Sequence, residues 1–307
     1  MTRPPRTLSL VPPTPTTRLR VADGRSIDLW YDDVPDAGTR VPLIFHAGTP
    51  SSGLGFEAFV DAARERGLRM AGWSRPGYGS STRQPGRRVD DVVSDTAAVL
   101  DYLRADRAYV VGHSGGGPHA LACAALLPER VVATALIAGL APWEAEGLDF
   151  LAGMGAENHA ELAAAVAGED ELVAYLAPQR EVILQLTGAD VAAMFGDLVD
   201  EVDRGAITGD YAEFLAENMR EGQRESSAGW LDDDLAFTRP WGFDLASVTG
   251  LVHVWQGGHD RMVPFAHGEW LAAHLPNACV HLHPAHGHLS IAVGSFPAIL
   301  DSLINAT

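Results

Sequence analysis

Cysteine is scarce in this sequence: Cys123 and Cys279 are the only two among its 307 residues. Two isolated cysteines do not form a disulfide framework or a cysteine-based zinc module. We therefore expect both in the core of a protein from a reducing compartment, with a cytoplasmic location. Lysine is absent, so all 22 basic residues are arginine, which we attribute to coding bias.

Long hydrophobic runs are also missing. No apolar stretch reaches the roughly 18–20 residues that a membrane-spanning helix needs. Residues 1–16 contain five prolines and no apolar segment of the kind that a secretory signal requires. We expect a flexible tail over residues 1–16 and no membrane partner.

Positive charge is in short supply, and the deficit is local. The formal net charge is −18, and residues 143–238 account for all of it, with 22 acidic residues against 4 arginines. Nucleic-acid recognition needs a basic face, so we expect no nucleic-acid partner. The plain interpretation of the acidic segment is a solvated surface that keeps the protein soluble. The alternative is a surface that attracts cationic substrates.

What the sequence does contain is an alternation of apolar strands with helices of 3.6-residue period. This alternation predicts an α/β protein with a mostly parallel sheet, flanking helices and ligands at the carboxyl ends of its strands. Before these strands and helices, apolar and polar residues alternate on both sides of Asp23–Gly24. This pattern predicts a β-hairpin with its turn at Asp23–Gly24. The predicted strands that follow lie at 41–46, 68–73, 107–111, 130–140, 250–256 and 279–283.

The alternation stops at residue 143 and resumes after residue 238. We therefore expect a core made of residues 17–142 and 239–307, with residues 143–238 forming an acidic, all-helical cap, or lid. Its helices are predicted at 157–167, 169–176, 178–186, 189–202 and 210–224, with a short turn after Trp230. Some of its Met and aromatic side chains should face the site, but such residues at helical spacing usually belong to a core, so the sequence assigns none of the seven candidates, which are Met154, Met194, Phe195, Tyr211, Phe214, Met219 and Trp230.

One motif organises the chain. Gly112–His113–Ser114–Gly115–Gly116 follows an apolar strand and precedes a helix. A serine at a sharp strand-to-helix turn is a nucleophile elbow, in which glycines let strand and helix come close. The start of the helix favours an anion. The pattern predicts Ser114 as a nucleophile.

A serine hydroxyl needs a base, and the base needs a group that orients it. His288, beside Gly287 and before the closing helix, is the predicted base, and His286 is the alternative. Asp260 lies in a Gly-rich turn after the preceding strand, where a carboxylate can reach that histidine. The order Ser114, Asp260, His288 is the one expected for this architecture.

The developing oxyanion needs backbone N–H donors. Gly115 should supply one, and Thr49 the other, with Gly48 as the second choice. We expect no cofactor. We also expect no metal, because two of the four histidines at 281–288 have strand spacing and no cysteine or carboxylate cluster joins them.

These motifs resemble the α/β-hydrolase superfamily, in its lidded serine-hydrolase branch. The resemblance rests on residues 46–50, 75–79, 112–116, 258–260 and 287–288, which occur in the family's order and spacing. It implies an α/β-hydrolase fold and cleavage of small to medium carboxylic esters through an acyl-enzyme. In that chemistry Ser114 is acylated, His288 acts as general base and then acid, and Asp260 orients it.

Alternatives remain open on the sequence alone. A proline iminopeptidase-like amidase would use the acidic lid to hold a substrate amine, although His46–Ala47–Gly48–Thr49–Pro50 departs from the H-G-G-P-G form of those enzymes. A C–C bond hydrolase could use the same triad, and a low-turnover ligand-binding signalling module is the non-enzyme alternative. The nucleophile Ser114 disfavours dehalogenase and epoxide-hydrolase chemistry, which uses Asp. The expected partner is a small-molecule ester or amide.

Overall fold

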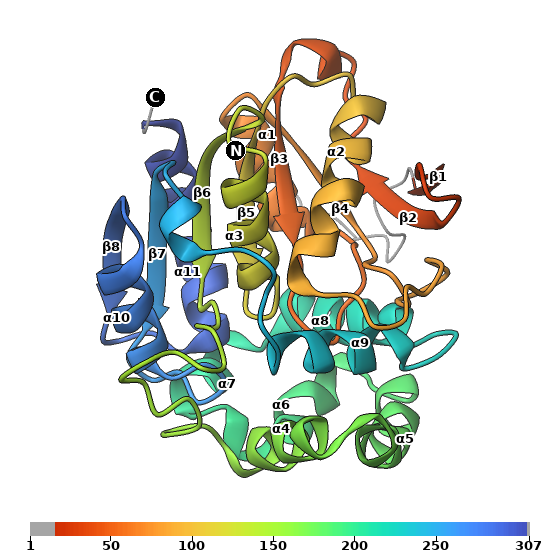
Figure 1. Ribbon diagram of the computed structural model, residues 1–307, viewed down its shortest axis with the longest axis vertical. Coiled ribbons are helices and arrows are strands. Elements are labelled where there is room, and N and C mark those ends of the chain that lie inside the picture. The colour runs from red at the N-terminus through yellow and green to blue at the C-terminus, as the bar shows by residue number, and fades with distance from the viewer. Residues whose placement is uncertain (1–15, 306–307) are drawn as a thin grey trace, which may run out of the picture.

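The computed structural model describes residues 16–305, so the predicted tail lies outside the described residues except for Thr16, which begins the first strand. The protein is built on one eight-stranded sheet with the order β1-β2-β4-β3-β5-β6-β7-β8 (Figure 1). Its strands are β1 Thr16–Arg20, β2 Ser26–Tyr31, β3 Val41–His46, β4 Leu68–Trp73, β5 Ala108–His113, β6 Val131–Ile137, β7 Val252–Gly257 and β8 Ala278–His283.

The first two strands form the predicted hairpin. Its turn contains Gly24, whose φ of +91° suits glycine. β1 and β2 pair antiparallel, β2 pairs antiparallel with β4, and every later pairing is parallel. The mostly parallel α/β sheet predicted from the sequence is therefore confirmed.

Helices cover both faces of the sheet. One core joins α1 (Glu57–Glu65) and α11 (His288–Ile304) to the sheet, and the other joins α2 (Val92–Tyr102), α3 (Gly116–Leu126) and α10 (Phe265–His274). Successive strand residues point to opposite faces, so a strand buried on both faces is apolar throughout. For example, neighbouring residues of β5 and of β7 divide between the two cores.

The segment between β6 and β7 is helical. Figure 1 shows these helices, coloured green to cyan, gathered at the carboxyl ends of the parallel strands. They are α4 Ala156–Ala167, α5 Glu169–Leu184, α6 Val191–Met194, α7 Glu201–Ala206, α8 Gly209–Gly222 and α9 Ala228–Phe237. None of the helices in residues 16–305 has the length and hydrophobicity needed to cross a lipid bilayer.

Three details of this segment differ from the sequence expectation. α5 is one helix that passes through the exposed Pro178, where solvent can reach the carbonyl that loses its partner. The predicted helix over 189–202 is broken, and α6 ends before Gly196, whose φ is +55°. The turn expected after Trp230 is instead the ten-residue helix α9.

Candidate active site

Ser114 lies between β5 and α3, as the elbow motif predicts. Its φ is +54°, a left-handed conformation that is strained for a residue with a side chain. Its N–H donates to the carbonyl of Ile137 in the neighbouring strand β6, at 2.9 Å. The flanking glycines are required, since a Cβ on Gly112 would lie 2.4 Å from the Gly116 carbonyl oxygen and one on Gly116 would lie 2.0 Å from that of His46.

Asp260 and His288 meet at the same edge of the sheet. Asp260 follows β7, and its Oδ2 accepts a hydrogen bond from Nδ1 of His288 at 2.8 Å. The other carboxylate oxygen, Oδ1, accepts from the N–H groups of Met262 and Val263 at 2.9 and 2.8 Å. Gln256 donates to Oδ2 at 3.0 Å. These contacts fix the buried carboxylate in one orientation beneath the imidazole.

The charge of Asp260 controls the titration of His288. Burial alone would lower the pKa of His288, but the charge and hydrogen bond of Asp260, with a contribution from Asp203, outweigh it and raise that pKa above 6.5. His113, with its ring centroid 5.0 Å from that of His288, behaves differently. Burial and then the charge of His288 lower its pKa to about 3, so His113 is neutral.

Thr49 and Gly115 come together beside Ser114. A Cβ on Gly115 would lie 2.5 Å from Oγ1 of Thr49, and one on Gly48 would lie 3.2 Å from Cβ of Ser114. Among the described residues, the backbone N–H groups of Thr49 and Gly115 have no hydrogen-bond acceptor. The structure therefore places the predicted oxyanion donors next to the predicted nucleophile.

Two cavities meet at Ser114. The larger, of about 160 Å³, also reaches Thr49 and Gly115, and the smaller, of about 80 Å³, also reaches His288. All seven of the Met and aromatic candidates that the sequence left unassigned line one of the two cavities. The larger holds Met154, Met194, Phe195, Met219 and Trp230, and the smaller holds Tyr211 and Phe214 together with Phe195 and Met219.

The model of one family, described as the alpha/beta hydrolase fold, matches residues 41–295. The chain belongs to this family. It is similar to the 2-hydroxy-6-oxononadienedioate/2-hydroxy-6-oxononatrienedioate hydrolase of Burkholderia vietnamiensis, with 26% identity over 87% of each chain. It is also similar to epoxide hydrolase B of Mycobacterium tuberculosis, at 33% identity over 35% of this chain and 31% of the other.

Solved structures show the same fold. The alpha/beta hydrolase fold protein of Nakamurella multipartita matches with a TM-score of 0.66 at 22% identity, over 95% of this chain and 99% of the other. The bromoperoxidase of Bacillus anthracis matches with a TM-score of 0.67 at 22% identity, over 95% and 100%. With curated relatives named as hydrolases and as an esterase, the chain is an alpha/beta hydrolase enzyme.

Asp203 is a part of this alpha/beta hydrolase site that sequence reasoning missed. It lies in α7, fully buried, and accepts hydrogen bonds from the N–H groups of His288, Leu289 and Ser290 at 2.8, 3.0 and 2.8 Å. It thus caps the first turn of α11, and a Cβ on Gly287 would lie 2.5 Å from the Asp203 carboxylate. The sequence around α11 does not indicate this cap, because Asp203 lies 85 residues before His288.

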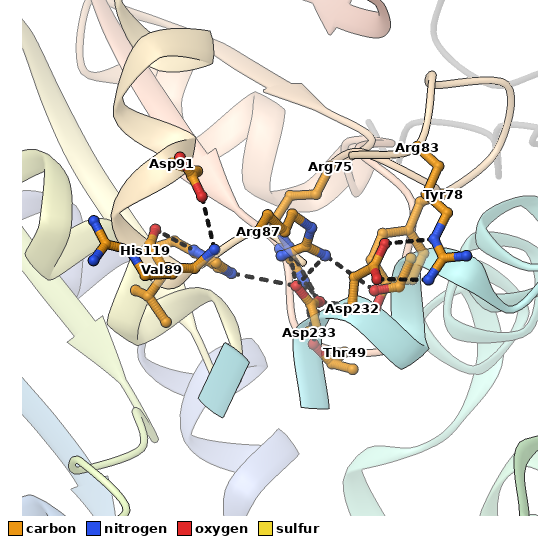
Figure 2. A network of polar contacts seen from close by, with 12 residues as sticks. Thr49, Arg75, Tyr78, Arg83, Arg87, Val89, Asp91, His119, Asp232 and Asp233 are labelled. Carbon is orange, nitrogen blue, oxygen red and sulfur yellow. Dashed lines mark hydrogen bonds and ion pairs between the residues drawn. The ribbon is translucent and has the colours of Figure 1, made fainter. Parts of the chain in front are cut away.

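Asp233 of α9 is a second buried carboxylate from the helical segment, and Figure 2 shows polar side chains converging on it. Burial alone would raise its pKa, but Arg75 and Arg87 outweigh burial and hold it well below the usual range. Its partners are Arg75 and Arg87 at 2.6 Å each, Thr49 Oγ1 at 2.7 Å, Tyr78 Oη at 2.8 Å and His119 Nε2 at 3.4 Å. This network connects α9 directly to Thr49.

The acidic run Asp232–Asp233–Asp234 was expected to be part of a solvated surface, and for these three residues that interpretation is wrong. Their exposed fractions are 1%, 0% and 2%. Asp232 pairs with Arg83 at 2.9 Å, and Asp233 pairs with Arg75 and Arg87. Ion pairing with residues far away in the sequence is what lets an Asp-rich segment form a buried helix.

A group of possible metal ligands lies on β7 and β8. His253 and Cys279 are opposite each other in the strand register, and Nε2 of His281 lies 3.0 Å from Nδ1 of His253 and 3.5 Å from Sγ of Cys279. Their donor atoms all lie within 4.8 Å of one another, and imidazole with thiolate suits zinc. Of the four histidines at 281–288, His281 is the one that the structure places beside a cysteine, and its second neighbour is His253 from the adjacent strand. The expectation of no metal stays a prediction.

Proposed function

We propose that this alpha/beta hydrolase cleaves small to medium carboxylic esters, with Ser114 as nucleophile, His288 as base and Asp260 as the group that orients it. The observation that carries the proposal is the elbow conformation of Ser114 at a cavity shared with His288, whose Nδ1 is held by Asp260 at 2.8 Å. The two cavities at Ser114 are where a small-molecule substrate would bind, and no step of the proposed reaction needs a cofactor.

Each residue has a defined step in this mechanism. His288 takes the proton of Ser114 as the serine oxygen attacks the ester carbonyl, and Asp260 stabilises the imidazolium. The N–H groups of Thr49 and Gly115 donate to the oxyanion, each such donor contributing about 3–4 kcal/mol in known enzymes. His288 then protonates the departing alcohol. Water, activated by the same histidine, attacks the acyl-enzyme and releases the acid and free Ser114.

We further propose that residues 143–238 act as a cap over the core formed by residues 17–142 and 239–307. The helices lie at the carboxyl ends of the strands (Figure 1), and their side chains form most of the lining of the larger cavity. A substrate bound at Ser114 would then be enclosed on one side by the sheet edge and on the other by these helices.

A fluorophosphonate probe tests the proposed nucleophile directly. We expect one covalent adduct per chain, located on Ser114 by peptide mass spectrometry, because only an activated serine attacks phosphorus at a useful rate. Ser94, which is exposed, offers a matched control, and Ser94→Ala should be labelled like the wild type. Labelling that persists in Ser114→Ala, or no labelling of the wild type, would contradict the proposal.

The rate should also follow the titration of His288. Because Asp260 raises the pKa of His288 and only the neutral imidazole accepts a proton, kcat/KM for p-nitrophenyl acetate should rise with pH through a midpoint above 6.5. Asp260→Asn should move the midpoint down and slow the reaction, since the raising charge is gone. Replacing the exposed His274 by Gln should leave the midpoint where it is. A midpoint below 6.5 in the wild type would argue against His288 as the base.

The similarity to the relative from Burkholderia vietnamiensis makes a C–C bond hydrolase the second candidate function. Its named compounds are dioates, which carry two carboxylates. In this chain the larger cavity is lined by Glu157, Glu161 and Asp234, and no arginine of residues 16–305 lines either cavity. A substrate carboxylate would find no cationic partner in the lining of the larger cavity, and burying an unpaired charge is costly. The lining therefore favours an ester or amide without a negative charge over a dioate.

A further inference from the structure

The larger cavity contains a pair of carboxyl groups that the proposed catalytic steps do not use. Glu161 comes from α4 and Asp234 from α9, and both line the cavity that reaches Ser114. Trp230 donates its indole N–H to Oε1 of Glu161 at 2.7 Å, which orients that carboxyl group. The other ionisable groups of the lining are Glu157 and Tyr175, so among the described residues no cationic side chain faces this space.

Asp234 differs from the two aspartates before it. Asp232 and Asp233 each have an arginine partner, whereas Oδ2 of Asp234 is buried without a hydrogen-bond partner among the described residues. Asp234 is 2% exposed, and its ionisable neighbours are the carboxyl groups of Glu161 and Asp233 and, with a smaller effect on its pKa, the guanidinium group of Arg87. A buried carboxylate without a partner is costly, so such a group is stabilised by binding a cation or a proton.

The titration of the pair agrees with the geometry. Burial and the neighbouring Glu161 raise the pKa of Asp234 well above its usual range, and burial raises the pKa of Glu161. The pair therefore retains a proton more readily than ordinary carboxyl groups. A cation placed between the two groups would offset both effects, because an opposite charge favours the ionised form.

The chemistry of the leaving group shows which part of the substrate meets this pair. His288 must protonate the departing group, so that group occupies the smaller cavity, which His288 lines. The larger cavity reaches Ser114, Thr49 and Gly115, but His288 is not part of its lining. The acyl part of the substrate therefore extends into the larger cavity, toward the carboxyl pair.

We propose that Glu161 and Asp234 form a subsite for a protonated amine on the acyl part of the substrate. The substrates are then esters or amides of amino acids, with the ammonium group between the two carboxyl groups and the hydrocarbon portion against the apolar lining. An ammonium group has three N–H donors and can satisfy the unpartnered oxygen of Asp234 as well as the side chain of Glu161. The inference rests on the proposed serine-hydrolase function and names its substrate class.

The test compares matched methyl esters. Amino-acid methyl esters with the amine two to six carbons from the carbonyl are each paired with the ester that has CH₃ in place of NH₃⁺. The kcat/KM ratio of amine to hydrocarbon is measured for each pair by methanol release. In the wild type we expect a ratio of at least about tenfold at one or more chain lengths, equivalent to about 1.4 kcal/mol. In Glu161→Gln/Asp234→Asn the ratio should fall to one or below.

Controls separate the possible failures. Asp170→Asn removes an exposed acidic charge from α5 and should keep the wild-type ratio. A wild-type ratio of one or less at every chain length, with the hydrocarbon esters still cleaved and Ser114 still labelled, would overturn the subsite and leave the serine hydrolase standing. Loss of all ester cleavage and of fluorophosphonate labelling in the wild type would overturn the proposed function itself.

Calorimetry on Ser114→Ala gives a second measurement that does not depend on turnover or on the folding of the double variant. 1-Hexylammonium should bind to this protein at least about tenfold more tightly than 1-hexanol, since both fill the same apolar space and only one carries the charge. Prior saturation with the ammonium should exclude the amine esters. Equal affinities for the two ligands would contradict the subsite.

Discussion

Ser114→Ala is expected to lower kcat for p-nitrophenyl acetate by about 10⁴- to 10⁶-fold, because loss of a nucleophile removes the acyl-enzyme route altogether. The fold should survive, since the Ser114 hydroxyl makes no hydrogen bond among the described residues and the backbone contact to Ile137 does not involve it. Initial rates test the expected loss of activity, and the thermal unfolding midpoint of the same preparation tests whether the fold is retained. The Ser94→Ala protein should match the wild type in both measurements.

A rate within tenfold of the wild type for Ser114→Ala would rule out the proposed nucleophile. A large loss of rate together with a thermal midpoint many degrees lower would show unfolding instead. In that event, fluorophosphonate labelling of the wild type at Ser114 decides the assignment, because it needs no variant.

Asp233→Ala should have the largest effect on stability. The substitution leaves Arg75 and Arg87, which are 3% and 5% exposed, without their shared carboxylate. Breaking a buried ion pair from one side typically costs about 3–5 kcal/mol, because the remaining charge stays buried without compensation. The free energy of unfolding, measured by urea denaturation, should fall by that amount.

Asp232→Ala is the matched comparison on the same helix. Its partner Arg83 is 34% exposed and can turn toward water, so a smaller loss is expected. The contribution of Asp233 also has a defined pH dependence. Its pKa in the folded protein is depressed, so the stabilisation is present above its unfolded-state pKa of about 4 and is lost as the pH falls through the folded value. An equal loss from both substitutions would contradict the assigned role of Asp233.

Ser114, Asp260 and His288 could be located from the sequence because each lies in a short local pattern at a strand end. Strand periodicity and glycine positions determine where such residues lie, and the parallel sheet brings its carboxyl ends together. The strand–helix alternation predicted the fold class for the same reason. These features depend on neighbours within about ten residues, which a single sequence displays.

Asp203, Asp233, Glu161 and Asp234 could not be assigned in this way. Their surroundings are set by contacts between the helical segment and the core, such as the pairing of Asp233 with Arg75 across 158 residues. In an acidic segment rich in helix formers, a buried aspartate has the same local signature as a solvated one. The helix α9 was missed for this reason, because three successive aspartates are poor helix formers until distant arginines neutralise them.

The buried carboxylates Asp203 and Asp233 also bear on how this enzyme could be recombined with its relatives. A chimaera that exchanged only residues 143–238 would remove both anions. The first turn of α11 would lose the acceptor for its N–H groups, and the buried guanidinium groups of Arg75 and Arg87 would lose their carboxylate partner. The portable unit is therefore the helical segment together with these arginines and the Gly287–His288 turn. Libraries that cut the gene at the segment boundaries alone should yield mostly insoluble protein, and those that transfer the larger unit should not.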